Sequence, residues 1–235
     1  MWDDLYLDDD FWKRVDSLVN SGKYRIDKDG KLSLMLQGQA HMNPWVFIKY
    51  PDNRECIHWG TYVEVFEFLP EFCKDLCWKV VIYPQNVEQL DYLYKRMEEW
   101  QYPSKCGVDL RDYVPDKKSN YAAFIYADSK FEAKSIYKRV RSELPDYFNI
   151  IIKSGCTEHE LDEHLKPNPE VERKLNTMFK MTNSDANYTQ PDWLKNKIRF
   201  WWLKYARSIG DQTYTKVAML PADKKQYKTY QKEVN

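Results

Sequence analysis

The sequence predicts an α+β fold built on a ferredoxin-like core, because the pattern between residues 77 and 153 runs strand, helix, strand, strand, helix, strand. This βαββαβ order closes into a four-stranded antiparallel sheet with both helices on one face, through two right-handed crossovers around a central pair of strands. Strand patterns precede this core and helical patterns follow it. We therefore expect an antiparallel β N-terminal extension and a helical C-terminal extension.

The N-terminal part of the chain shows one helical pattern followed by strand patterns. Residues 10–20 have apolar residues at helical spacing behind an acidic run, which favours a helix. Residues 24–36 predict a hairpin, because Gly30 can supply the positive φ that a tight turn requires. Residues 44–50 and 56–65 predict a second strand pair around a Pro-Asp-Asn turn. We expect these strands to lie against the core sheet.

The core consists of four predicted strands and two predicted helices. Apolar residues recur at the strand period in the former and at the helical period in the latter. Asn86 and Ser129 are placed to cap the two helices with their side-chain oxygens. Pro84 ends the first strand, and Pro145 follows the second helix. The predicted strands cover residues 77–83, 107–114, 121–127 and 148–153, and the predicted helices cover residues 87–100 and 130–144.

Two further helices are predicted after the core, over residues 169–181 and 192–209. The second begins after Pro191, ends before Gly210, and is the longest helix expected in the chain. We expect three regions that together form one compact unit. These are residues 1–70 as the N-terminal helix and strands packed on the core, 71–160 as the core, and 161–235 as the helical extension.

The composition indicates a folded protein and excludes a membrane-spanning one. With 9 Trp, 18 Tyr and 10 Phe against 7 Gly, the chain can bury a large core. Its 36 Lys and Arg balance its 36 Asp and Glu, so no overall field recruits nucleic acid or anionic lipid. The chain contains no run of about 18 apolar residues, and its acidic start is unlike a secretion signal. We therefore predict a cytoplasmic protein without membrane contact, in which thiols stay reduced.

Four cysteines fall at the ends of predicted strands, and the ferredoxin-like order brings those ends to one edge of the sheet. Neighbouring strands are about 4.8 Å apart and next-nearest strands about 10 Å apart, so loop residues at this edge can converge. Four thiolates, or three with a histidine, are the ligands of a structural zinc ion. The sequence therefore predicts a zinc site at this edge. Its candidate ligands are Cys73, Cys77, Cys106 and Cys156, with His159 as an alternative ligand.

Two other interpretations of the cysteines stay open. Cysteine is often a buried filler of apolar cores, and only Cys73 and Cys77 form a close pair here. An enzyme would instead use a reactive thiol, or a metal with three ligands and one water, with Glu158 and Glu160 available for proton transfer. The sequence contains no phosphate-binding loop or nucleophile-elbow motif that would name a reaction.

The same strand order occurs in RNA-recognition modules, which bind bases on the sheet face opposite the helices. Alternation along the predicted strands places aromatic and basic residues together on this face, as base stacking and phosphate contact require. However, Lys79 and Ala122 stand where such modules have aromatic residues, and the N-terminal strands are an alternative cover for the face. The candidate nucleic-acid residues there are Lys79, Tyr83, Arg111, Tyr113, Phe124, Tyr126 and Lys153.

The Trp-rich C-terminal helix is a second candidate surface. Its residues Arg199 and Trp201 are candidate nucleic-acid contacts. Exposed Trp and Arg are also common at protein interfaces, so we prefer another protein, or a second copy of the chain, as the partner of this helix. The main interpretation of the pattern itself is a helix packed on the core with a solvated basic side, which accounts for most such patterns.

The sequence thus predicts a non-catalytic binding or assembly protein with a structural metal, zinc, at one edge of its core sheet. Nucleic-acid binding is the alternative function. An enzyme that uses a metal or thiol at the cysteine edge is the third possibility, and no residue is predicted to be catalytic.

Overall fold

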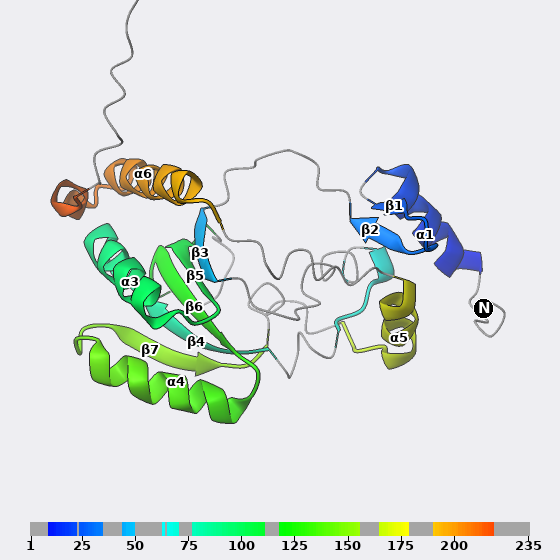
Figure 1. The fold of residues 1–235 in the computed structure, drawn as a ribbon, viewed down its shortest axis with the longest axis horizontal. Coiled ribbons are helices and arrows are strands. Elements are labelled where there is room, and N and C mark those ends of the chain that lie inside the picture. The colour runs from blue at the N-terminus through cyan, green and yellow to red at the C-terminus, as the bar shows by residue number, and fades with distance from the viewer. Residues whose placement is uncertain are drawn as a thin grey trace, which may run out of the picture.

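The computed structural model describes residues 9–22, 24–34, 44–49, 63, 65–70, 77–110, 118–155, 165–178 and 190–218 (Figure 1). These residues form a five-stranded sheet with helices, and a smaller group made of helices and a two-stranded hairpin. The predicted α+β class is confirmed. None of the described helices has the length and apolar character needed to cross a membrane.

The main sheet has the strand order β3-β5-β6-β4-β7, and each strand is antiparallel to its neighbours. Alternation along β4 sends Val80 and Ile82 to the face covered by helices and Val81 to the opposite face. The five strands are β3 (Trp45–Lys49), β4 (Trp78–Tyr83), β5 (Ser104–Val108), β6 (Tyr121–Ala127) and β7 (Asn149–Lys153).

The edge strand β3 distinguishes this sheet from the predicted four-stranded one. β3 pairs with β5 and lies opposite Gly107, whereas its predicted pairing with residues 56–65 stays a prediction, because most of those residues are not described. A Cβ atom on residue 107 would lie 2.2 Å from the carbonyl oxygen of Pro44, so glycine is what permits this close approach. Val63 and Val65 of the predicted partner strand are helical, and most of that strand lies outside the described residues.

The strand β5 also begins earlier than the sequence predicts. The predicted strand covers residues 107–114, whereas the observed one is Ser104–Val108, and residues 111–117 are not described. Glycine is depleted inside strands, so Gly107 marks a strand boundary in the sequence pattern. In the structure it lies inside the strand, where β3 approaches. The shift moves Cys106 from a loop into the strand itself.

Three helices and one face of the sheet share the main apolar core. The helices α3 and α4 cover this face, and α6 lies beside α3 and β3 (Figure 1). A short 3₁₀ helix, η4, follows α6 and contacts α3. The bounds are α3 (Val87–Trp100), α4 (Lys130–Glu143), α6 (Asp192–Ser208) and η4 (Gln212–Lys216).

Side-chain oxygens cap α3 and α4 as predicted. Asn86 and Ser129 each accept a hydrogen bond from the backbone N–H three residues later, at 2.9 and 3.1 Å respectively. The start of α3 has a further cap from the segment after α6, because the Asp211 carboxylate accepts a 2.7 Å hydrogen bond from the Val87 N–H. The C-terminal segment is thereby attached to the start of α3.

A second apolar cluster joins elements from the two halves of the chain. The predicted hairpin is present in it, with Gly30 at φ +74° in its turn. Leu175 is fully buried in this cluster among residues of the N-terminal helix and hairpin. Its elements are α1 (Asp9–Asn20), β1 (Tyr24–Ile26), β2 (Leu32–Leu34) and α5 (Pro169–Met178). The division into three regions stays a prediction.

Candidate functional site

Two of the predicted metal ligands are described, and the strand register separates them. Cys77 directly precedes β4. Cys106 of β5 and Ile82 of β4 are opposite the same residue of β6, the strand between them, so Cys106 lies level with Ile82. Cys106 therefore lies five residues further along the sheet, about 16 Å, and two strands away, about 10 Å. Thiolates bind zinc at about 2.3 Å, so these two thiols cannot share one ion.

The Cys106 thiol is packed in the main core and has no access to solvent. Burial raises the pKa of this thiol far above its ordinary value, and the nearby Arg199 guanidinium opposes the shift only in part. The thiol therefore stays protonated, which removes support for a reactive cysteine at this position. In this respect Cys106 fits the interpretation of a buried filler.

The other predicted ligands, Cys73, Cys156 and His159, lie outside the described residues, as do Glu158 and Glu160. Among the described residues no group of three or more His, Cys, Asp and Glu could hold a metal ion. A zinc site that uses Cys77 without Cys106 stays a prediction.

The centre of the sheet face opposite the helices is buried in the structure. Phe124 packs there with Val81 and Ala122, and Tyr83 and Tyr126 lie against this group. Phe124 is 5% exposed and its neighbour Lys79 is 4% exposed, so this ring and this ammonium are not accessible for base stacking or phosphate contact, whereas Tyr83 and Tyr126 are half-buried. Lys153, half-buried, is opposite Lys79 in the register, and Arg111 and Tyr113 lie outside the described residues.

Lys105, which is half-buried, also lies on this face, although the sequence pattern did not predict it there. Its ammonium lies 4.7 Å from the ring centre of Trp45, 5.5 Å from that of Phe124 and 5.8 Å from that of Phe47. The Lys79 ammonium lies 6.0 Å from the same Phe124 ring and 3.9 Å from the Cys77 sulfur. The predicted start of β5 at residue 107 excluded Lys105 from the strand, which is why it was missed.

The inner side of α6 is attached to α3 and β3 by polar contacts. The Arg199 guanidinium donates to Asp91 at 2.5 Å and stacks 4.7 Å from the ring centre of Tyr94. The Lys195 ammonium lies 2.8 Å from Glu98. Arg199, a predicted nucleic-acid contact, is therefore engaged within the core.

Trp201 and Trp202 also serve the packing of α6. Trp201, the other predicted contact on this helix, is half-buried and stacks on Tyr205 with 5.7 Å between ring centres. The Trp202 indole N–H donates to the Pro44 carbonyl at 2.8 Å and so connects α6 to the start of β3.

The outer side of α6 carries a continuous stripe of aromatic and basic side chains, called here the outer stripe. Its members are spaced by four, three, four and three residues, so they follow one line along the helix. Both rings are open to solvent, Trp193 with 67% and Phe200 with 50% exposure. The Lys204 ammonium lies 4.9 Å from the ring centre of Phe200. The outer stripe consists of Trp193, Lys197, Phe200, Lys204 and Arg207.

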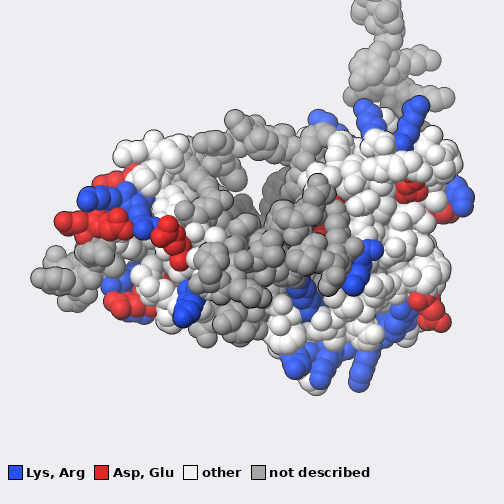
Figure 2. Space-filling view, turned by 180° about the vertical axis from the view of Figure 1, so that it is seen from behind, with Lys and Arg blue, Asp and Glu red and all other residues white. Residues whose placement is uncertain are grey.

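The three cations of the outer stripe have no carboxylate partner among the described residues. The surrounding unit is also positively charged: its described residues 44–49, 77–110, 118–155 and 190–218 contain 18 Lys and Arg against 11 Asp and Glu. Figure 2 shows basic side chains along the upper and lower margins of this half of the molecule, where α6 and α4 lie. The zero net charge of the whole chain therefore hides a local excess of positive charge.

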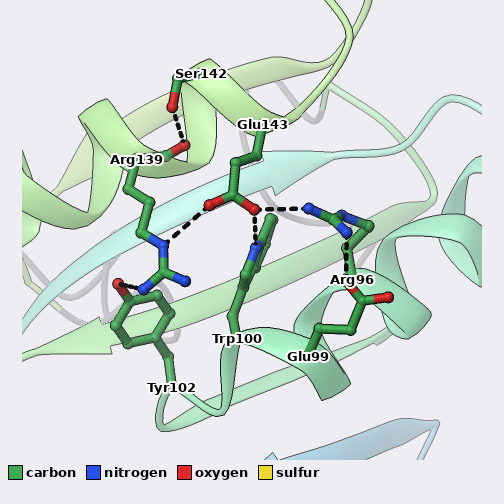
Figure 3. A network of polar contacts seen from close by, with 7 residues as sticks. All are labelled: Arg96, Glu99, Trp100, Tyr102, Arg139, Ser142 and Glu143. Carbon is green, nitrogen blue, oxygen red and sulfur yellow. Dashed lines mark hydrogen bonds and ion pairs between the residues drawn. The ribbon is translucent and has the colours of Figure 1, made fainter.

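A closed polar network joins the ends of α3 and α4 (Figure 3). The Glu143 carboxylate accepts hydrogen bonds from Arg96 at 2.6 Å, from the Trp100 indole at 2.7 Å and from Arg139 at 3.0 Å. These contacts, that of Trp100 first, lower the pKa of Glu143. Arg139 donates in turn to the Tyr102 hydroxyl at 3.0 Å. Because the Glu143 carboxylate already has three donors, this network serves to connect the two helices.

Comparison with known proteins gave no match: no family model fits the chain, and neither the curated proteins nor the solved structures contain a significantly similar one.

Proposed function

We propose that this chain is a non-catalytic, cytoplasmic binding protein that holds an anionic partner on the outer stripe of α6. The observation that carries this proposal is the alternation of two exposed rings with three cations that no described carboxylate neutralises. Exposed aromatic rings beside arginine are a composition that interfaces favour, and the two lysines add positive charge that attracts an anionic partner. The inner side of α6 supports the proposal, because its contacts with α3 and β3 hold the stripe on a rigid element.

We propose in addition that the platform beneath α6 is a ferredoxin-like unit with one added strand. The chain passes through β4, α3, β5, β6, α4 and β7, and these four strands lie in the order β5-β6-β4-β7. The added strand β3 extends the sheet beyond β5, and α6 packs on β3. Binding through α6 would leave the folding of this platform unchanged.

Elution from a heparin column in rising NaCl tests the proposed surface, with heparin as a generic polyanion. We expect the triple variant K197Q/K204Q/R207Q to elute at clearly lower salt than the unaltered protein, because it lacks the three outer-stripe charges. The matched control K118Q/K134Q/K138Q removes three exposed cations that are not part of α6.

The control decides between a local surface and a general charge effect. A smaller shift in the control than in the α6 variant supports the outer stripe as the binding surface. An equal shift in both variants would mean that heparin responds only to net charge, and the proposal would then be abandoned. Circular dichroism of both variants checks that the fold is intact.

A further inference from the structure

We infer that the anionic partner of the outer stripe is a single-stranded nucleic acid, with bases stacked on Trp193 and Phe200 and phosphates bound by the three cations. This inference rests on the proposed function and adds the chemistry of the partner. It moves the predicted nucleic-acid surface from the sheet face, where Phe124 and Lys79 are buried, and from Arg199, which is engaged with Asp91, to the outer side of α6.

The spacing of the outer stripe suits a strand that lies along the helix. Trp193 and Phe200 are seven residues apart, which is about 10 Å at a rise of 1.5 Å per residue. Lys197 lies between the two rings, and Lys204 and Arg207 continue the line beyond Phe200. A flexible single strand can place a base on each ring and phosphates beside the intervening cations. A duplex keeps its bases stacked inside and cannot use the rings in this way.

The outer stripe fits a membrane surface less well, because a helix that lies in a lipid interface needs a broad apolar side. The aliphatic side chains of α6 point to the protein instead: Ile198 is buried in the main core, and Leu194 and Leu203 pack against it. The stripe itself has no aliphatic member.

An acidic peptide could pair with the three cations. It would leave the faces of Trp193 and Phe200 without the flat partners that every nucleobase supplies. Both exposed rings lie on the same line of the helix as the cations, and this arrangement favours nucleic acid over an acidic protein segment.

Fluorescence anisotropy of a labelled 15-mer of deoxythymidine, which forms no duplex, measures the proposed interaction in the full chain. Three phosphate contacts predict a slope of about −2 for the logarithm of the binding constant against the logarithm of salt concentration. We expect W193A/F200A to bind this strand about 30-fold more weakly, since each stacked base contributes at least about fivefold. The same variant should elute from heparin as the unaltered protein does, because heparin has no bases.

The matched control F131A/Y147A removes two exposed rings, 83% and 58% accessible, that lie outside α6, and it should bind the strand normally. Equal binding by W193A/F200A and the unaltered protein would overturn the nucleic-acid inference, as would a polyglutamate peptide that displaces the strand at equal charge concentration. In either case the heparin result for K197Q/K204Q/R207Q would still stand, so the proposed function is tested separately.

Discussion

Arg199 and Asp91 form an ion pair between α6 and α3, with 2.5 Å between nitrogen and oxygen and both side chains 6% exposed. Lys95 approaches the other oxygen of Asp91 at 2.7 Å from the solvent side. A buried charge is tolerated only when it has a partner, so this pair helps to fix which side of α6 faces the protein. The pair thus acts together with the apolar packing of Ile198 and Trp202 to leave the outer stripe exposed.

Replacement of Asp91 by alanine leaves the Arg199 guanidinium buried without its counter-charge. We expect a loss of about 3–5 kcal/mol in the free energy of unfolding, measured by urea denaturation. Lys95→Ala is the matched control, because it removes only the exposed partner of the same carboxylate and should cost less than about 1 kcal/mol. Similar costs for the two variants would show that the pair is not desolvated as the structure indicates.

Asp211 predicts a specific acid dependence of stability. Burial opposes its ionisation, but hydrogen bonds from Thr213, the Val87 N–H and the Tyr121 hydroxyl outweigh burial and hold the pKa of this carboxyl below its ordinary value. Because the pKa is lower in the folded than in the unfolded chain, Asp211 stabilises the fold above the unfolded pKa of about 3.9. This contribution disappears as the pH falls through the folded pKa.

The variant Asp211→Asn tests this linkage. At pH 7 we expect a loss of about 1–2 kcal/mol, because the cap on α3 and the bond to Tyr121 weaken. At pH 3 the difference from the unaltered protein should be smaller, since part of the Asp211 contribution has already gone there. Urea unfolding at both pH values gives the comparison, and an equal difference at both would mean that the charge of Asp211 contributes nothing.

The periodic features of the core were readable from the sequence because they are local. Alternation placed Val80 and Val81 on opposite sheet faces, and two polar residues before helical patterns gave the caps of α3 and α4. The partner of β3 was not readable, because it depends on Gly107, about sixty residues away, allowing close approach of another strand. Strand register is set by such long-range packing, and an error there moved Cys106 to the wrong level.

The two sides of α6 differ in what determines them. Hydrophobic periodicity places Ile198 and Trp202 on one side of the helix, and this side packs on the core as the sequence pattern indicates. The ion pairs of Arg199 and Lys195 with Asp91 and Glu98 on α3 were not readable, because the partners lie about a hundred residues away in the sequence.

Lys79 predicts a stabilising substitution. Its ammonium is 4% exposed and contacts a thiol and an aromatic ring, with no carboxylate partner among the described residues. Methionine has a similar length and no charge to desolvate, so we expect Lys79→Met to raise the free energy of unfolding by about 1 kcal/mol or more. Lys195→Met is the control, because Lys195 is also buried but paired with Glu98, and its replacement should destabilise the fold. Destabilisation by both substitutions would indicate that Lys79 has a favourable role that its contacts do not show.

The strand register separates the cysteines into those near one end of the sheet and Cys106, which lies far from that end. Lys153 is opposite Lys79, so the chain leaves β7 beside the start of β4, where Cys77 lies, and Cys156 follows three residues later in the sequence. Cys106 is far from this end of the sheet. We therefore predict that protein purified without chelator contains about one zinc ion per chain, as expected for a site with one structural ion.

Mass spectrometry of metal content for two single variants tests this prediction. Cys77→Ser should lose the ion, whereas Cys106→Ala should retain it, because the Cys106 thiol is buried and protonated in the main core. Loss of zinc in Cys106→Ala without a change in circular dichroism would contradict the register of β5. Absence of zinc from the unaltered, reduced protein would leave Cys77, like Cys106, as a packing residue, and the function would then rest on the outer stripe alone.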